Sequence, residues 1–257
     1  MKMFALVAAG ISSVALAGNV DVVEDIFTSQ TWTADNVYNL TKQIYVRPGA
    51  TLTIQGGTRV VSEATGNGSG SLCVANGAQL FVNGESGAPV VMTSNLDDGT
   101  WRASCNEWGN LTICGDAYIG FDGVTNSGGF PSNTLSPSAS NEANMEGLLE
   151  EAGNLTLNNY GGGDDNYDAG SISYLSIRYG GRVQGLSNEL NGLSLGALGR
   201  GTQIHHVEIM NNVDDGIEIW GGTVGLKYIT IWNIGDDSFD VDQGWRGKAQ
   251  FGLIVQG

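Results

Sequence analysis

Two stretches near the C-terminal end contain the residues that could do chemistry, Asn212–Gly222 (NVDDGIEIWGG) and Asn233–Gly244 (NIGDDSFDVDQG). In each stretch an Asp-Asp pair precedes a short run of alternating apolar and acidic residues, and the two pairs are 22 residues apart. Carboxylates held close together raise one another's pKa, and an acid of raised pKa beside an ionised carboxylate suits the cleavage of a glycosidic bond. Carboxylate oxygens are also the ligands that calcium prefers.

The same 22-residue step aligns the end of the chain with itself. Asp214–Gly235 aligns with Asp236–Gly257, which places Ile217 over Phe239, Ile219 over Val241, Gly222 over Gly244, Ile229 over Phe251 and Ile231 over Leu253. Leu190–Val213 is an earlier copy that is two residues longer. Each copy holds two short runs with the period of a strand. Strands that repeat at this step, and that cannot bury their faces alone, stack into the coils of a parallel β-helix.

The N-terminal half follows the same scheme less regularly. Pro48–Val61 and Asn76–Ser94 share a Gly-Ala-x-Leu core, 28 residues apart, and Trp108–Ile119 predicts a third strand pair. The alternation disappears between about residues 123 and 159, which we interpret as a long insertion on one coil. Asn141–Gly153 predicts one helical turn within this insertion.

The two ends of the chain predict export and an open last coil. Residues 1–17 have a short positive start, an apolar stretch and an Ala-x-Ala site, which predicts a cleaved secretory signal peptide. The β-helix domain is then predicted over residues 18–257, in a secreted or cell-surface protein. A strand is predicted to end at Gly257 with no polar coil after it, so we expect a continuation of the chain or a partner to cover that coil.

Net charge, apolar segments and cysteine positions limit which partners and cross-links the chain can have. The net charge is −16, which argues against nucleic acid as a partner but permits divalent cations. No segment after the signal peptide has enough uninterrupted apolar residues to span a membrane. Cys105 and Cys114 flank a short loop, and whether they form a disulfide is left open by the sequence.

The Gly-Ala-x-Leu segments and the 22-residue coils resemble the pectin-lyase-like superfamily, which implies a right-handed parallel β-helix. The second half is similar to uncharacterised secreted bacterial β-helix proteins. A narrower resemblance links Asp215 in "DGIEI" and the pair at 236–237 to polygalacturonase-type glycoside hydrolases. That resemblance implies Asp236 as the general acid, with Asp215 and Asp237 holding the attacking water. The Gly-His-Gly and Arg-x-Lys motifs of that family have no match here.

Three interpretations of the acidic stretches follow. Side chains one coil apart lie about 4.8 Å apart in a stacked β-helix, so the Asp pairs, and likewise Glu218 and Asp240, are expected to be neighbours. They could act as a catalytic set. They could equally form a turn that each coil repeats, because Asp accepts hydrogen bonds from nearby backbone N–H groups. They could bind calcium through four residues, Asp214, Asp215, Asp236 and Asp237.

Aromatic residues near the acids suggest a surface for sugar rings. The expected substrate-binding set is Glu218, Trp220, Tyr228, Trp232, Asp240 and Trp245. The alternative is that these aromatic side chains cover neighbouring loops or the insertion. Because adjacent residues of a strand face opposite sides, His205 is expected to point inward and His206 outward, in line with Tyr228 and Gln250, which argues against zinc bound by both.

The sequence therefore predicts an exported β-helix protein that binds a polysaccharide or a cell-surface glycan without catalysis. A glycoside hydrolase or lyase acting on an extracellular polysaccharide is one alternative. A structural repeat module of a larger adhesin is the other, because the fold alone does not decide among the three.

Overall fold

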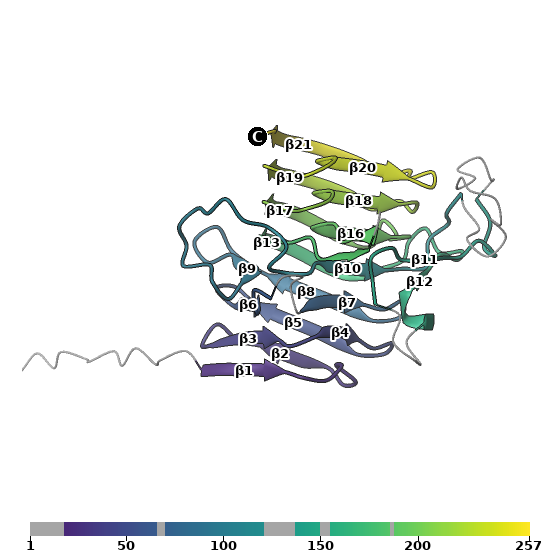
Figure 1. The fold of residues 1–257 in the computed structure, drawn as a ribbon. Coiled ribbons are helices and arrows are strands. Elements are labelled where there is room, and N and C mark those ends of the chain that lie inside the picture. The colour runs from purple at the N-terminus through teal and green to yellow at the C-terminus, as the bar shows by residue number, and fades with distance from the viewer. Residues whose placement is uncertain (1–17, 66–69, 121–136, 150–154, 186–187) are drawn as a thin grey trace, which may run out of the picture.

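The structure is a computed structural model that describes residues 18–65, 70–120, 137–149, 155–185 and 188–257. Nearly all of its regular structure is β-strand, and parallel strands stack above one another along one axis (Figure 1). The predicted parallel β-helix is confirmed. The predicted signal peptide, residues 1–17, lies outside the described residues.

One parallel sheet takes a single four-residue strand from each coil. In spatial order its strands are β20 (Phe239–Asp242), β18 (Ile217–Trp220), β16 (Leu193–Gly196), β10 (Leu111–Cys114), β7 (Ser71–Val74) and β4 (Gln43–Val46). The register pairs Leu193 with Ile217, and Ile217 with Phe239. These pairs are the ones that the 24- and 22-residue steps predict, so the sequence repeat is the coil itself.

The second sheet has 11 strands, and each coil contributes two segments to it. One path through the sheet runs β1 (Gly18–Val22), β3 (Asn36–Leu40), β6 (Arg59–Ser62), β9 (Val90–Ser94), β13 (Gly170–Arg178), β17 (Gln203–Met210), β19 (Gly225–Trp232) and β21 (Lys248–Val255). Beside it, β2 (Gln30–Trp32), β5 (Thr51–Gln55) and β8 (Gln79–Asn83) pair in turn and end on the first half of β13. Leu52 pairs with Leu80, which confirms the 28-residue step.

A bend in the middle of each long strand joins the two segments in the C-terminal coils. The bend residues Tyr174, His206, Tyr228 and Phe251 have φ between 48° and 62°, in the left-handed region. Their rings stack face to face with centroids 4.3, 4.5 and 5.0 Å apart along the series. Aromatic stacking of this kind offsets part of the strain of the left-handed backbone. We call these four residues the aromatic column.

The bend corrects the expectation that His205 points inward. Ile204 and Val207 are buried, whereas His205 and His206 are both partly exposed. The Nδ1 atoms of the two imidazoles are 2.9 Å apart. Strict alternation fails here because His206 occupies the bend. The inward pattern that ends at Ile204 starts again at Val207, and the two histidines between them both face outward.

The bend also corrects the alignment of the last coil. His205 is in line with Lys227 and Gln250, while His206 stacks on Tyr228, which stacks on Phe251. Ile229 therefore pairs with Gly252, and the predicted pairing of Ile229 with Phe251 is wrong by one residue. The segment between β20 and β21 is one residue longer than the matching segment between β18 and β19. The step from β19 to β21 is 23 residues for this reason.

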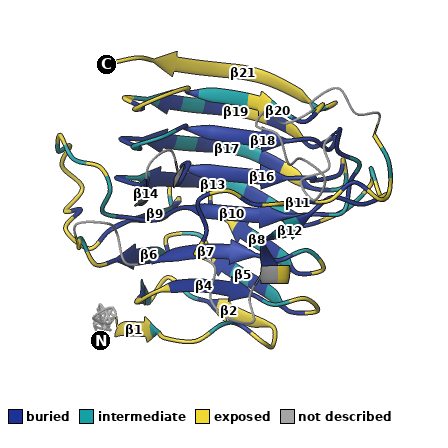
Figure 2. Ribbon diagram, turned by 45° about the vertical axis from the view of Figure 1, so that its right-hand side comes forward, coloured by how far each residue is buried: buried dark blue, intermediate teal, exposed yellow. Residues whose placement is uncertain are grey.

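The core runs through the middle of the coils and is exposed at the two end strands. Inward-facing Ile, Leu and Val side chains fill it over the whole stack. Figure 2 shows β4 to β18 as mostly buried, with β1 and β21 exposed. Leu253, Ile254 and Val255 on β21 are 51–59% exposed. The predicted cover for this coil stays a prediction.

A long segment between β10 and β13 interrupts the stack, close to the predicted insertion at 123–159. Its described part contains β11 (Ala143–Asn144), the 3-10 helix η1 (Leu155–Asn158) and β12 (Asn159–Tyr160), and β11 pairs antiparallel with β12. The helical turn predicted over 141–153 is wrong for residues 141–149, which form a short strand and a turn, and residues 150–153 lie outside the described residues. A smaller hairpin, β14 (Val183–Gly185) with β15 (Asn188–Glu189), precedes β16.

The three cysteines are free. Cys105 is exposed, and Cys73 and Cys114 are buried, so the open question of a bond between Cys105 and Cys114 is answered in the negative. Burial raises the pKa of the Cys114 thiol to about 12. No helix in the described part of the chain is long and apolar enough to cross a membrane.

Candidate functional site

The coil stacking places the two Asp-Asp pairs one above the other at the start of β18 and β20. The backbone N–H of Asp237 donates a hydrogen bond of 2.9 Å to Oδ1 of Asp215, and the N–H of Gly216 donates to the carbonyl of Asp237 at 2.9 Å. Asp215 therefore does what the turn interpretation requires, because its carboxylate accepts a hydrogen bond from the next coil.

Two asparagine side chains hold this turn, Asn191 from the neighbouring coil and Asn212 from the turn itself. The side-chain carbonyl of Asn191 accepts the N–H of Asp215 at 3.2 Å, and its Nδ2 donates to Oε2 of Glu218 at 2.6 Å. Nδ2 of Asn212 donates to the carbonyls of Leu190 and Asp215, both at 2.9 Å. The sequence offered a signal for Asn191, because it precedes its strand by two residues as Asp215 does. The site predicted from the sequence does not include Asn191.

Five carboxylates form what we call the acidic cluster, namely Asp214, Asp215, Glu218, Asp236 and Asp240. Two groups within it each have one oxygen per residue, all within 4.8 Å of one another. One group is Asp214, Asp215 and Asp236, and the other is Asp215, Glu218 and Asp240. Among the described residues, none of the five forms an ion pair with Lys or Arg. The cluster thus concentrates negative charge without a nearby positive side chain.

Burial and mutual repulsion raise the pKa of three of these acids. Burial, and then the charge of Asp214, raises the pKa of Asp215 to about 7. Burial, and then the charge of Glu146 in the inserted segment, raises the pKa of Glu218 to about 9. The pKa of Asp214 is also raised, by burial and by Glu189 and Asp236. The folded chain therefore favours a proton or a bound cation at this place.

The inserted segment covers the outer face of the six-stranded sheet beside the acidic cluster. Trp220, which follows the cluster on β18, is 4% exposed and packs with Tyr160, Met145 and Leu148 of the insertion. A Cβ atom on Gly196 would lie 2.6 Å from the Tyr160 ring and 2.7 Å from the Met145 methyl group. The insertion therefore lies directly on the sheet. Asp215 and Glu218 are only 8% and 9% exposed.

The aromatic residues predicted to bind sugar do not surround the acidic cluster. Trp220 is buried under the insertion, and Tyr228 and Trp232 belong to β19 in the other sheet. Trp245 donates its indole N–H to the carbonyl of Val224 at 3.0 Å and packs against the core. For Trp220, the contact with the insertion is the one that the alternative interpretation predicted.

The residues of the polygalacturonase resemblance are only partly brought together. Asp215 and Asp236 share one of the two close groups, whereas the exposed Asp237 belongs to neither. Arg246 and Lys248 lie in a groove over the 11-stranded sheet and not beside the carboxylates. The basic side chains that would hold an acidic sugar at this site are therefore absent from the described residues around the cluster.

The spacing of the oxygens meets the condition for binding one hard cation. Oxygens that bind one calcium ion at about 2.3–2.6 Å are at most about 5 Å apart, and oxygens within 4.8 Å of one another meet that condition. The carboxyl groups of glycosidases are about 5–5.5 Å or about 6.5–9.5 Å apart, depending on mechanism. The residues fit calcium, with Asp215 as the ligand common to both groups.

Comparison with known proteins assigns the family. The family model described as a pectate-lyase like beta helix domain matches residues 24–257. No curated protein and no solved structure matches the chain. The match covers the acidic cluster, the insertion and every strand of the stack from β2 to β21. The chain therefore belongs to the pectate-lyase-like β-helix family.

Proposed function

We propose that this chain is an exported polysaccharide-binding β-helix domain that binds calcium in its acidic cluster and does not catalyse a reaction. The observation that supports this function best is the pair of three-carboxylate groups within 4.8 Å, which have no positive partner among the described residues. Burial and then mutual repulsion raise the pKa values of Asp215 and Glu218, and a bound divalent cation offsets the cost of both for the ionised carboxylates. The family and the signal-like first residues support a location outside the cytoplasm.

The near-complete burial of Asp215 and Glu218 supports binding without catalysis. A general acid has to reach the oxygen of the glycosidic bond, and a glycosidase leaves room between its carboxyl groups for the sugar. Here carboxylate oxygens lie within 4.8 Å of one another and the insertion lies beside them. Exposed carboxylates at the edge of the cluster, such as Asp236, remain able to meet a ligand through a shared cation.

Calorimetric titration with calcium tests this proposal. We expect the wild type to bind calcium, and Glu218→Gln to bind it at least about tenfold more weakly, because one charged ligand is lost while the hydrogen bond from Asn191 is kept. Glu142→Gln, an exposed change in the insertion, is the matched control. A wild type that binds no calcium at millimolar concentration contradicts the calcium part. A polysaccharide panel in which no member is retained, with calcium or with EDTA, contradicts the binding part.

A glycoside hydrolase is the second candidate, favoured by the pKa of about 7 at Asp215. An acid that titrates near neutral pH, one coil from Asp236, has the protonation behaviour of a glycosidase acid. Release of reducing sugar from the same panel by wild type, and not by Asp236→Asn, would replace the non-catalytic proposal. Equal absence of release from both proteins rejects the hydrolase.

A further inference from the structure

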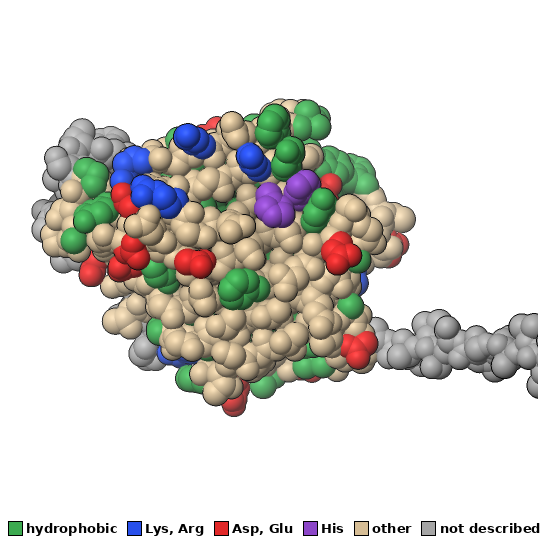
Figure 3. Space-filling model, turned by 180° about the vertical axis from the view of Figure 1, so that it is seen from behind, with side chains coloured by type: hydrophobic (Ala, Val, Ile, Leu, Met, Phe, Trp, Pro, Cys, Tyr) green, Lys and Arg blue, Asp and Glu red, His purple; other side chains and the backbone are tan. Residues whose placement is uncertain are grey.

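A groove over the 11-stranded sheet gathers positive side chains in an otherwise acidic protein. The groove has a volume of about 490 Å3. Four of the 11 Lys and Arg residues of the chain line it, Arg200, Lys227, Arg246 and Lys248, and no Asp or Glu is among its described lining residues. Figure 3 shows these cations, with the two histidines, gathered over the C-terminal coils on that face. We call this feature the cationic groove.

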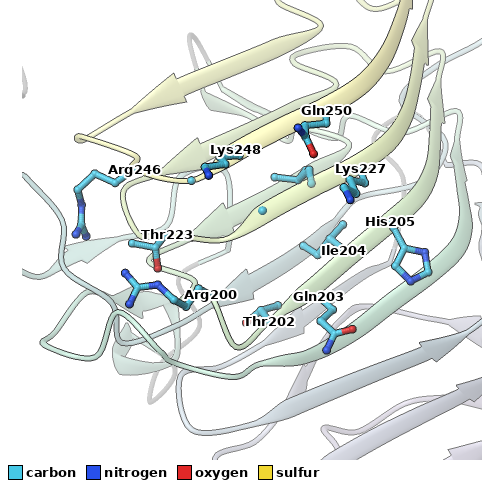
Figure 4. Close-up of a pocket in the computed structure, with 13 residues that line it drawn as sticks. Arg200, Thr202, Gln203, Ile204, His205, Thr223, Lys227, Arg246, Lys248 and Gln250 are labelled. Atoms are coloured by element: carbon cyan, nitrogen blue, oxygen red, sulfur yellow. The ribbon is translucent and has the colours of Figure 1, made fainter.

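Coil stacking builds the groove from two rows of outward-facing positions. In one row Gln203, Gly225 and Lys248 are in register on β17, β19 and β21. In the second row His205, Lys227 and Gln250 are in register on the same three strands. In Figure 4 the side chains of Gln203, His205, Lys227, Lys248 and Gln250 come from these strands, and those of Arg200, Thr223 and Arg246 come from the turns before them. Donors that lie far apart in the sequence therefore meet in one place.

Much of the positive charge in the groove is not neutralised by the protein. In the part of the chain that the structure describes, Lys227 and Lys248 form no ion pair. Arg200 donates to the neutral side-chain oxygen of Asn166 at 3.0 Å. Only Arg246 is paired, with Asp165 at 2.7 Å from Nη2 to Oδ1. Three cations are therefore available to an anion.

The centre of the groove is bare because Gly225 has no side chain. A Cβ atom on Gly225 would have one neighbour within 4 Å, the carbonyl oxygen of Lys248 at 3.6 Å. Donors surround this bare position, with Lys248 on one neighbouring strand, Gln203 on the other, and Lys227 two residues further along the same strand. A group that accepts hydrogen bonds in several directions suits such a centre better than a planar carboxylate with two oxygens.

We propose that the cationic groove binds a sulfate-type ester, a tetrahedral oxyanion, carried on a saccharide. Three acceptor oxygens of the ester face Lys248, Lys227 and Gln203 around Gly225. The groove volume lies within the range of about 300–1,000 Å3 that is typical of small-ligand sites. The net charge of −16 repels long polyanions such as nucleic acid, so the ligand is a short anionic segment.

This proposal goes beyond the calcium-binding function, because it concerns a different sheet and none of the acidic-cluster residues. A sulfate ester and a phosphate ester offer the same tetrahedral oxyanion, and a uronic acid offers a carboxylate instead. Calorimetric titration of the chain from Gly18 with matched oligosaccharides distinguishes these sources. The probes are a sulfated oligosaccharide, its desulfated form, a phosphorylated oligosaccharide, an oligogalacturonate and inorganic sulfate.

We expect the sulfated oligosaccharide to bind, and the desulfated form to bind at least about tenfold more weakly, because the charged hydrogen bonds are lost. Lys227→Gln with Lys248→Gln should weaken binding by about tenfold or more, whereas Lys42→Gln, on another part of the chain, should leave it unchanged. Gly225→Leu should abolish binding by filling the bare centre. Gly87→Leu is its matched control, since a Cβ there meets nothing within 4 Å and the site is far along the chain.

Some outcomes overturn the proposal directly. Equal affinity for the sulfated and desulfated forms would show that the groove does not recognise the oxyanion. A preference for the phosphorylated form or for the oligogalacturonate would show that the ligand carries that group and not a sulfate ester. Binding of inorganic sulfate but of no oligosaccharide would show that the groove does not recognise a saccharide. Unchanged binding in Gly225→Leu, with a wild-type circular dichroism spectrum and melting temperature, moves the ligand away from the groove. Calcium titration of the same variants keeps this test separate from the acidic cluster, because the two results do not depend on each other.

Discussion

The acidic cluster lies on two of the three coils that build the cationic groove, and the two regions have opposite charge. The cluster lies at the starts of β18 and β20, where carboxylate oxygens are within 4.8 Å of one another beside the insertion. The groove lies on β17, β19 and β21, where Gly225 leaves an open centre. Asn211 and Asn233, with φ of 55° and 56°, lie in the turns that lead from β17 to β18 and from β19 to β20, so each face keeps its own row of side chains. One coil can therefore contribute to two unrelated binding surfaces.

Two glycines give the sharpest contrast between the regions. A Cβ on Gly235, in the turn that precedes Asp236, would lie 1.8 Å from the carbonyl oxygen of Val213, whereas Gly225 has open space. We expect Gly235→Ala to cost about 3 kcal/mol or more of unfolding free energy through this clash, and Gly225→Ala to change it by less than about 0.5 kcal/mol. Urea unfolding measures both. Equal midpoints for the two variants would mean that the turn of the acidic cluster is not tightly packed.

The pH dependence of stability should come from the acidic cluster. The folded-state pKa values of Asp215 (about 7) and Glu218 (about 9) are above those of the unfolded chain. Their contribution is complete below about pH 4, where both states are protonated. It is then lost as the pH rises through 7 and 9, because the unfolded chain releases these protons more readily. We expect Tm in EDTA to fall by about 4–8 °C between pH 5 and pH 9, which corresponds to about 2 kcal/mol.

Two additions sharpen this pH experiment. Calcium should restore most of the lost Tm at pH 9, because it binds the ionised carboxylates of the folded state. Glu218→Gln should flatten the pH dependence, while the exposed Glu142→Gln should leave it as in the wild type. A Tm that rises from pH 5 to pH 9 in EDTA would contradict the raised pKa values of Asp215 and Glu218, because buried acids of raised pKa lower the stability as the pH rises.

The two aspartates of the second pair should differ in calcium binding. Asp236 belongs to a close group and Asp237 does not. We expect Asp236→Asn to weaken calcium binding by about tenfold, or about 1.4 kcal/mol, and Asp237→Asn to leave it unchanged in the same titration. The opposite order would support the arrangement that the polygalacturonase resemblance implies, in which Asp237 contributes its side chain.

The smallest expected effect concerns the aromatic column beside the groove. The Tyr228 ring stacks on His206 at 4.5 Å and on Phe251 at 5.0 Å. Tyr228→Leu should cost about 1 kcal/mol by removing these stacks, and Tyr228→Phe should be close to neutral because it keeps the ring. Thermal unfolding at constant pH checks the pair. A Leu variant as stable as the Phe variant would mean that stacking contributes nothing to the bend.

Much of the fold was predictable because each coil buries the same positions. The pairs Ile217 with Phe239 and Val207 with Ile229 follow from apolar residues that recur at one step, and a strand in the wrong register would expose them. The step failed between β19 and β21 because one additional residue in a turn changes the spacing without changing the apolar pattern. Periodicity does not detect a bend either, so the inward direction assigned to His205 was wrong.

The sites were predictable to different degrees for a related reason. The acidic cluster was visible because Asp214 and Asp236 recur in sequence, whereas contact between the insertion and Trp220 was only one of two alternatives, since it depends on tertiary packing. The cationic groove was invisible. Its four cations, from Arg200 to Lys248, follow no single step and meet only where turns and strands of successive coils are stacked. The net charge of −16 describes the whole chain but gives no information about where its few cations gather.

The stacking of coils also has a consequence for how such a protein could evolve. Inserting one whole coil would move neighbouring rungs apart by about 4.8 Å on every face at once. The length of a binding surface that spans several coils would then change by one coil at a time, while the side chains on each coil stayed the same. Selection for a longer or shorter glycan would act on the number of coils before it acted on any individual side chain.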